Sequence, residues 1–544
     1  MTMHIARYVL LVALCMSIAV AAQQGPAPSE PAGKGIVRGV VTALDTGKPI
    51  RNATVAIQPG DGPLTLGMLS VFTDAQGRYE FSGLKAGQYG LNARKAGYLS
   101  LSYGQTRVNG GSRLVTLSES TSLDKIDFAL PLAGVIVARI TDQFGDPVRG
   151  VMVRPFVQRF AEGRRQLSSL GLSGAGAVTD DRGETRIHSL APGDYYLAAI
   201  PDYTVMWRGD VETLFPGTLD MASAQTVRVG AGQEAFATFP IQRARPGSLS
   251  GRIVNSEGGP PTTPFASLEQ VQLSGSGSSR RINLAPDGSF REENLPPGDW
   301  MIVAREPEFG SARVRLLGDA IQGITVTTRK AAAVRGRVRF EGAAPPADPV
   351  FLVVMFDGPR TLGLSAGFVR SAEGVSAIRA TPEEQWAFRA QISGVGAIRA
   401  RAAGWILKAV LLDGKDVTDA PLDFGAAYSG KPVEVVLTQR KGEVSGVVQN
   451  DRGQLTSDYQ VVLFPEDEMQ WTPFSRAFAV GGPDQQGRFT IQNLPPGRYF
   501  AAAVESLEQG DDRNPEVLSR LRGGAISFEL SEGESRTVTL RLTR

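Results

Sequence analysis

The chain has 544 residues, a length that accommodates roughly three to five domains. Its 57 basic and 55 acidic residues nearly cancel, so no bulk charge favours nucleic acid or an anionic membrane, and we expect no nucleic-acid partner. Glycine and proline are abundant, at 63 and 34 residues, which indicates many short elements joined by tight turns.

The N-terminus has the pattern of a secretory signal peptide. Arg7 precedes an apolar run over residues 8–20, and small residues up to Ala22 would permit cleavage. We therefore expect a signal peptide over 1–22, a flexible lead-in over 23–34, and export to the periplasm, the outer-membrane surface or the medium; an uncleaved anchor is the alternative. No later stretch reaches the length of an apolar membrane helix, so we expect no integral membrane domain.

Cysteine and histidine usage limits the chemistry that the chain can perform. Cys15 and His4 lie in the expected signal peptide, which leaves His188 as the single histidine of the mature chain. Such a chain has no disulfide and no Cys/His zinc site, and we expect no metal and no cofactor. A catalytic triad would depend on His188, which has no recognisable nucleophile or carboxylate partner. We predict that the protein is not an enzyme, although a pair of carboxylates in a glycosidase-like site stays open.

One motif recurs along the chain: a leucine, two residues that are mostly small or proline, a glycine, any residue and an aromatic. Its four copies end at Tyr89, Tyr195, Trp300 and Tyr499. The first three copies are about 105 residues apart and the last gap is about twice as long, so we expect a degenerate copy at 392–396. A fixed period of this kind is typical of tandem structural repeats.

Two further features keep the same period. A turn with Asp and Gly precedes each motif by about ten residues, and we expect the Asp side chain to cap the turn while the Gly adopts a positive φ. These turns contain Asp74, Asp180, Asp287 and Asp484. Each repeat also opens with an apolar, β-rich strand, and the five opening strands begin near residues 37, 135, 249, 334 and 444.

These features predict an all-β protein made of about five β-sandwich modules in tandem. The expected boundaries are 35–133 for module 1, 134–244 for module 2, 245–332 for module 3, 333–441 for a divergent module 4, and 442–544 for module 5. One short helix is expected at 515–522, with Pro515 in its first turn and Gly523 after its end. Modules with few contacts across their boundaries are expected to form an elongated rod.

The opening strand, the Asp-x-x-Gly-x-Pro turn, the Asp-x-x-Gly-x-Tyr/Phe turn and the Leu-x-Pro-Gly-x-Tyr motif together resemble the carboxypeptidase regulatory-like domain. The resemblance implies a prealbumin-like (immunoglobulin-like) β-sandwich, related to the B-type repeats of collagen adhesins and often grouped with carbohydrate-binding-like folds. Modules 1, 2, 3 and 5 match well, whereas module 4 matches only at its start. In metallocarboxypeptidases this domain follows the catalytic domain and holds no zinc ligands, so the resemblance implies a fold and not an activity.

Aromatic residues in irregular insertions are the candidate ligand contacts. Trp207, with Tyr203 nearby, and Trp471 lie in longer loops, where an exposed ring can stack on a sugar or anchor a neighbouring module. Trp300 and Trp405 lie in alternating strands and are expected in the core. The leading hypothesis is a non-catalytic exported scaffold or adhesion protein of the bacterial cell envelope that binds an envelope protein. The alternative is an accessory protein that binds extracellular polysaccharide through exposed loop aromatics.

Overall fold

The computed structural model describes residues 33–543, apart from 60–67, 162, 171–175, 202–208, 263–264, 272–278, 305–307, 343, 357–367, 372–377, 426–427 and 429. The expected signal peptide and nearly all of the expected lead-in lie outside the described residues. Nearly all regular elements of the described part are β-strands, which confirms the all-β prediction. No helix within these ranges is long and apolar enough to cross a membrane.

Module 1 is a sandwich of two small sheets. Its first sheet consists of β4 (Arg78–Leu84), β1 (Gly35–Ala43), β8 (Ser122–Leu123) and β9 (Phe128–Leu130). Its second sheet consists of β3 (Leu69–Phe72), β2 (Thr54–Pro59), β5 (Gly87–Arg94), β6 (Leu101–Ser102) and β7 (Val115–Leu117). Every second residue of β1 is buried, as in Val37 and Val41, because one face of this sheet packs on the other sheet.

Modules 2 and 3 repeat this arrangement. In module 2 the two sheets are formed by β14 (Glu184–Leu190), β10 (Gly134–Thr141) and β18 (Glu234–Pro240), and by β12 (Arg164–Ser169), β13 (Ala177–Val178), β11 (Met152–Ala161), β15 (Gly193–Ile200), β16 (Thr213–Leu214) and β17 (Thr226–Val229). In module 3 they are formed by β22 (Ser289–Leu295), β19 (Gly247–Val254) and β25 (Ala320–Thr327), and by β21 (Ser279–Asn283), β20 (Phe265–Val271), β23 (Gly298–Ala304), β24 (Glu308–Leu316) and β26 (Arg329–Lys330).

Modules 4 and 5 keep the same core strands with more additions. The sheets of module 4 consist of β29 (Phe368–Ser371), β31 (Ala387–Ser393), β27 (Ala332–Glu341), β36 (Val433–Thr438), β33 (Ile406–Leu412) and β34 (Lys415–Asp416), and of β30 (Ile378–Ala380), β28 (Val350–Phe356), β32 (Val395–Arg401) and β35 (Leu422–Asp423). Module 5 contains β38 (Leu455–Thr456), β37 (Gly442–Gln449), β41 (Arg488–Leu494), β44 (Ser535–Thr543), β42 (Gly497–Val504), β39 (Gln460–Pro465), β40 (Ala479–Gly481) and β43 (Ile526–Leu530). The helix α2 (Pro515–Arg522) is capped by Asn514 and lies where the sequence predicts it.

One pairing scheme unites the five modules. The opening strand lies between an antiparallel neighbour, which leads into the Leu-x-Pro-Gly motif, and a parallel neighbour near the end of the module. The degenerate copy at 392–396 forms the corresponding connection in module 4, between β31 and β32, and Ile392 is fully buried like the motif leucines. The prediction of five tandem sandwiches is therefore confirmed.

The aromatic residue of the Leu-x-Pro-Gly motif stabilises its own turn through a hydrogen bond. In each of the four regular copies its polar tip donates a hydrogen bond to the carbonyl four residues earlier. The pairs are Tyr89 Oη to Lys85 O at 2.9 Å, Tyr195 Oη to Ala191 O at 2.6 Å, Trp300 Nε1 to Pro296 O at 3.0 Å, and Tyr499 Oη to Pro495 O at 2.6 Å. The aromatic ring is buried, and its polar tip provides the hydrogen-bond donor for the turn carbonyl. This explains why the motif contains Tyr or Trp rather than Phe.

The Asp-Gly turns at Asp74, Asp180 and Asp484 are capped as expected. In module 3 the capping position is Ala285, and Asp287 accepts from Ser289 N, at 3.0 Å. Asp180 Oδ1 accepts hydrogen bonds from the backbone N–H groups of Glu184 and Arg182, both at 2.9 Å, and Gly183 has a φ of 72°. The turns at Asp74 and Asp484 repeat this geometry. Capping therefore accounts for these carboxylates, and among the described residues no three His, Cys, Asp or Glu side chains converge as a metal site.

Capping has a testable consequence for titration. The backbone hydrogen bonds from Glu184 and Arg182 favour the ionised carboxylate, and they lower the pKa of Asp180 from its ordinary value of 3.8. Its stabilising contribution is thus complete above pH 3.8 and disappears as pH falls through the lower folded-state value. We expect an NMR titration of the carboxyl carbon to give a midpoint below 3.8; a midpoint at or above that value would contradict the capped geometry.

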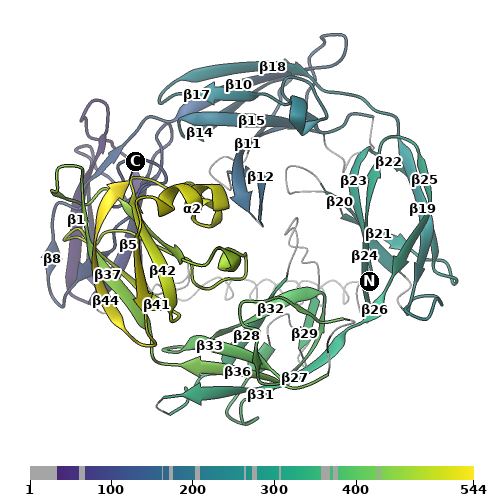
Figure 1. Cartoon of the computed structure of the whole chain (residues 1–544). Helices are drawn as coiled ribbons and strands as arrows, with labels where there is room; N and C mark the ends of the chain where they lie inside the picture. The colour runs from purple at the N-terminus through teal and green to yellow at the C-terminus, as the bar shows by residue number, and fades with distance from the viewer. Residues whose placement is uncertain are drawn as a thin grey trace, which may run out of the picture.

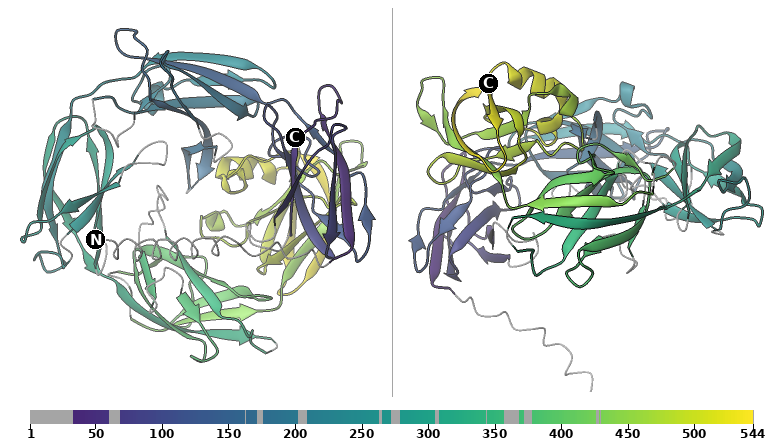
Figure 2. Two further views of the ribbon diagram at one scale, coloured as in Figure 1. Left: turned by 180° about the vertical axis from the view of Figure 1, so that it is seen from behind. Right: turned by 60° about the horizontal axis from the view of Figure 1, so that its bottom comes forward.

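The modules are arranged in a ring and not in the expected rod. Following the colours in Figure 1, modules 1 to 5 succeed one another around a single turn, and the tilted view in Figure 2 shows module 5 lying over module 1. The connections are short: β9 ends at Leu130 and β10 starts at Gly134, while β36 ends at Thr438 and β37 starts at Gly442. Short connections fix the angle between neighbours, and successive bends in one direction bring the last module back to the first two.

Each module has its own apolar core. The hydrophobic clusters of the described residues each lie within one module, from Val37, Phe81 and Leu130 in module 1 to Val444 and Phe489 in module 5. The ring is therefore an assembly of independently packed sandwiches that meet through smaller, more polar contacts.

Candidate functional site

Of the residues that the sequence singles out as ligand contacts, the structure describes Trp471. Tyr203 and Trp207 lie outside the described residues. Trp471 follows a short 3₁₀ helix (Glu468–Gln470) in module 5, where its Nε1 donates to Pro465 O at 2.9 Å and its ring meets Phe464 edge to face. These contacts tie Trp471 to the cluster beneath α2. The predictions for Trp300 and Trp405 are confirmed, because both rings are buried.

His188 occupies an exposed position on β14. Its Nδ1 lies 2.9 Å from the Oγ of the adjacent Ser189, a local contact between sequence neighbours. Its place on the outer face of the strand agrees with the prediction of an ordinary surface residue.

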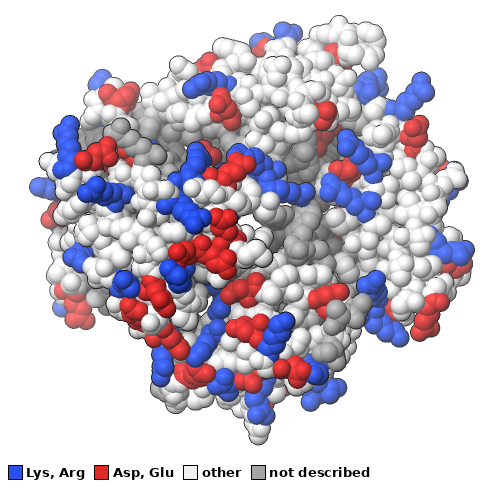
Figure 3. Space-filling view, in the orientation of Figure 1, with Lys and Arg blue, Asp and Glu red and all other residues white. Residues whose placement is uncertain are grey.

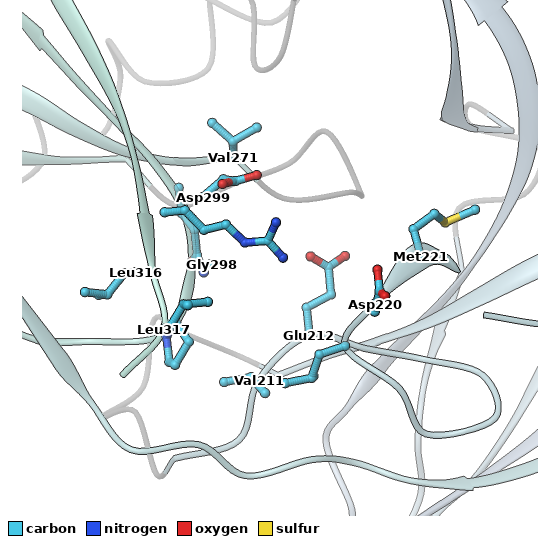
Figure 4. Close-up of a pocket in the computed structure, with 13 residues that line it drawn as sticks. Val211, Glu212, Asp220, Met221, Val271, Gly298, Asp299, Leu316 and Leu317 are labelled. Atoms are coloured by element: carbon cyan, nitrogen blue, oxygen red, sulfur yellow. The ribbon is translucent and has the colours of Figure 1, made fainter. Parts of the chain in front are cut away.

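A groove between modules 2 and 3 is a candidate site that two modules build together (Figure 4). Its volume is about 290 Å³. Module 2 supplies the segment around β16 and the 3₁₀ helix that follows it (Met221–Ser223), with Val211, Glu212, Leu219, Asp220 and Met221. Module 3 supplies the ends of β20, β23 and β24, with Gln270, Val271, Pro297, Gly298, Asp299, Arg315, Leu316 and Leu317. Because two modules build it, the groove exists only where modules 2 and 3 pack together.

Local structure holds the module 2 wall in place. Val211 N donates to Gln242 O at 3.0 Å, which ties this segment to the connection that leads into module 3. Asp220 caps the 3₁₀ helix by accepting from Ala222 N at 3.2 Å. Thr213 is fully buried, and its hydroxyl donates to Val211 O and accepts from Gln242 N. The groove wall is therefore a fixed surface.

The groove combines negative charge with exposed apolar side chains. Glu212 and Asp220 face it from module 2 and Asp299 from module 3, against Arg315 in the lining. Asp299 is paired with Arg313 at 2.8 Å. Leu219 and Leu317 stand on opposite modules at exposed fractions of 51% and 73%.

This combination differs from the surrounding surface. In the space-filling view, basic and acidic side chains are interspersed over the visible face of the ring (Figure 3). A large exposed leucine on each side of a lined groove is the kind of patch that marks an interaction surface. Sequence reasoning missed it, because Leu219 and Leu317 are about one hundred residues apart and only the bend between modules 2 and 3 brings them together.

The fold is that of a multi-module β-sandwich protein, and the groove at one module boundary is its candidate site. The family model described as the carboxypeptidase regulatory-like domain matches residues 36–121. The resemblance inferred from the motifs is therefore confirmed for module 1. No curated protein matches the sequence.

Solved structures of bacterial surface proteins align with the chain at low identity. A streptococcal ancillary pilin is 14% identical over 54% of this chain and 99% of its own, with a TM-score of 0.21. GBS52, the minor pilin of Streptococcus agalactiae, is 17% identical over 39% of this chain and 96% of its own, with a TM-score of 0.22. Two B repeat units of the collagen-binding protein of Staphylococcus aureus are 11% identical over 75% of this chain and 99% of their own, with a TM-score of 0.14. TM-scores this low assign no function to this chain.

Proposed function

We propose that this protein is a non-catalytic, exported scaffold of the bacterial cell envelope that binds a protein partner in the groove between modules 2 and 3. The observation that carries the proposal is the pair of exposed leucines, Leu219 and Leu317, on opposite walls of a groove rich in carboxylates. Apolar contact with these leucines supplies affinity, and the carboxylates select the charge of the partner.

The groove favours a polypeptide segment that carries both apolar and basic side chains. A basic side chain is attracted to Glu212 and Asp220, whereas an acidic one is repelled. A peptide of alternating leucine and lysine therefore serves as a probe, and its leucine–glutamate counterpart of equal length is the control peptide.

We expect the leucine–lysine peptide to bind the ring in a fluorescence anisotropy titration, and the variant Glu212→Lys to weaken that binding about tenfold, equivalent to about 1.4 kcal/mol. Glu257→Lys, in an exposed turn of module 3, changes the net charge equally and should leave binding unchanged. Leu317→Ala should also weaken binding, whereas Phe236→Ala, at the same exposed fraction of 73%, should not.

Equal effects of Glu212→Lys and Glu257→Lys would show that the peptide senses only overall charge, and the groove proposal would then be abandoned. Polysaccharide binding is the alternative outcome. Retardation of the ring in a polysaccharide gel, lost in Trp471→Ala, would favour the carbohydrate hypothesis instead.

A further inference from the structure

The contacts that close the ring are concentrated where module 5 meets modules 1 and 2, a region that we call the seam. On the module 1 side, Arg107 forms ion pairs with Asp458 and Glu505, both at 2.8 Å. Arg113 donates through Nη2 to the carbonyl and the hydroxyl of Ser457, at 2.9 and 2.6 Å. Both arginines lie in the connection between β6 and β7, which reaches out from the sandwich toward module 5.

Backbones approach each other closely at the same place. Gly110 and Ser506 form an isolated antiparallel β-bridge. A Cβ atom on Gly111 would lie 2.2 Å from Tyr459 O, and one on Gly482 would lie 2.7 Å from Ser112 O. Both distances are shorter than any side chain tolerates, so the seam closes only because glycine occupies these positions.

Module 2 makes the second half of the seam through its long β11–β12 hairpin. Arg159 donates to Gln509 Oε1, and Arg165 pairs with Glu516 in the first turn of α2, both at 2.5 Å. A Cβ atom on Gly510 would lie 1.9 Å from Phe160 O. The module 5 partners belong to the insertion between β42 and β43, which carries α2, the α-helix of the described chain. The insertion into module 5 thus forms its contacts with module 2.

The seam differs in kind from the junction between modules 4 and 5. There the guanidinium of Arg476 donates hydrogen bonds from two nitrogens to the Asp419 carboxylate, at 3.0 and 3.1 Å, and Arg399 donates to Phe474 O. Those two arginine side chains are only 18% and 14% exposed. At the seam the paired side chains of Arg107 and Arg165 are 41% and 52% exposed. Exposed ion pairs are weak and screened by salt, whereas desolvated ones are screened much less.

We propose that the seam is a reversible clasp: the ring opens between module 5 and modules 1 and 2, while module 5 stays attached to module 4 and all five sandwiches stay folded. No hydrophobic cluster of the described residues spans the seam, so opening exposes little apolar surface. Each sandwich retains its own core, and polar contacts at the seam are exchanged for contacts with water.

The test measures two distances in the full chain with Cys15→Ser. Spin labels at exposed positions 116 and 486 report across the seam, and labels at 415 and 486 report across the junction of modules 4 and 5. At low salt we expect one short 116–486 distance. In 1 M NaCl, where the Debye length falls to about 3 Å, a longer population should appear while the 415–486 distance stays constant.

Two variants separate the clasp from general salt effects. Gly111→Ala should produce the longer 116–486 population at low salt, whereas Gly90→Ala, where a Cβ meets its nearest atom at 3.7 Å, should not. Arg107→Glu should act like Gly111→Ala. Circular dichroism and thermal unfolding of the sandwiches should stay unchanged in all three.

The proposal fails if the 116–486 distance stays single in high salt and in both seam variants. It also fails if that distance lengthens only together with the 415–486 distance, which would place the opening elsewhere. Loss of β-structure in step with the distance change would likewise overturn it, because the seam would then be part of one cooperative unit.

Discussion

Gly446→Ala is expected to destabilise module 5 by about 3 kcal/mol, the upper end of the cost of overpacking a core. Gly446 lies on β37 between two neighbouring strands, opposite Phe489 on β41 and Val538 on β44. A Cβ atom there would lie 1.9 Å from Val538 O and 3.0 Å from the Phe489 ring. Hydrogen exchange measured by mass spectrometry on module 5 peptides should therefore rise sharply, because the strand pairing must give way.

The control is Gly90→Ala on β5, where a new Cβ meets only ordinary van der Waals contacts of 3.7 Å and longer. This variant should leave the exchange of its own module almost unchanged. If hydrogen exchange rose equally, or not at all, in both variants, the close approach at Gly446 would be ruled out. Glycines of the other opening strands share its situation. A Cβ would lie 2.0 Å from Ile324 O at Gly251 and 2.3 Å from Val433 O at Gly336, both on the parallel neighbour, and 1.9 Å from Ile126 O, between β8 and β9, at Gly39.

Module 2 is a natural variant of this arrangement. Ala138 stands where the other opening strands have glycine, and it pairs with Thr185 where the other modules have Tyr or Phe. The larger residue on the opening strand thus accompanies a smaller one on its antiparallel neighbour. The Gly–aromatic pair is therefore a matched packing unit that links the opening strand to the Asp-Gly turn.

Trp300→Ala is the second change with a large expected effect, about 3–5 kcal/mol for loss of a buried tryptophan. Trp300 is 2% exposed in the core of module 3, and its Nε1 donates to Pro296 O. Trp300→Phe keeps most of the ring but leaves that carbonyl without its donor, so its cost should be about 1–3 kcal/mol. Hydrogen exchange should increase in module 3 peptides in the order wild type, Trp300→Phe, Trp300→Ala.

The same experiment tests the independence of the modules. Because the core around Trp300 contains only module 3 residues, the exchange of module 5 peptides should not change in Trp300→Ala. A parallel increase in both modules would mean that the ring unfolds as one unit, contrary to the separate cores.

The local features of the chain could be predicted because their causes lie within a few residues. A motif such as Leu295-Pro-Pro-Gly298-Asp-Trp300 contains both partners of its own hydrogen bond, from Trp300 to Pro296. Asp180 and the N–H groups that it caps lie within four residues. The period of about 105 residues then gives the number of sandwiches, and alternation along β1 gives the buried face.

The candidate site could not be predicted in the same way. Trp471, chosen from the sequence as a loop aromatic, packs into its own module, whereas Leu219 and Leu317 carry no pattern that marks them. An exposed leucine gains significance only from its neighbours in space, and those neighbours belong to another module.

The amino-acid sequence by itself therefore determined the all-β class, the five repeats, the capped turns and the short helix α2, since each depends on contacts within a strand, a turn or one module. The tertiary structure decided the ring, the groove and the seam. Arg107 meets Asp458 across about 350 residues, and Gly111 can approach Tyr459 only after four connections have each set an angle. Such angles depend on packing between modules, and no periodicity in the sequence records them.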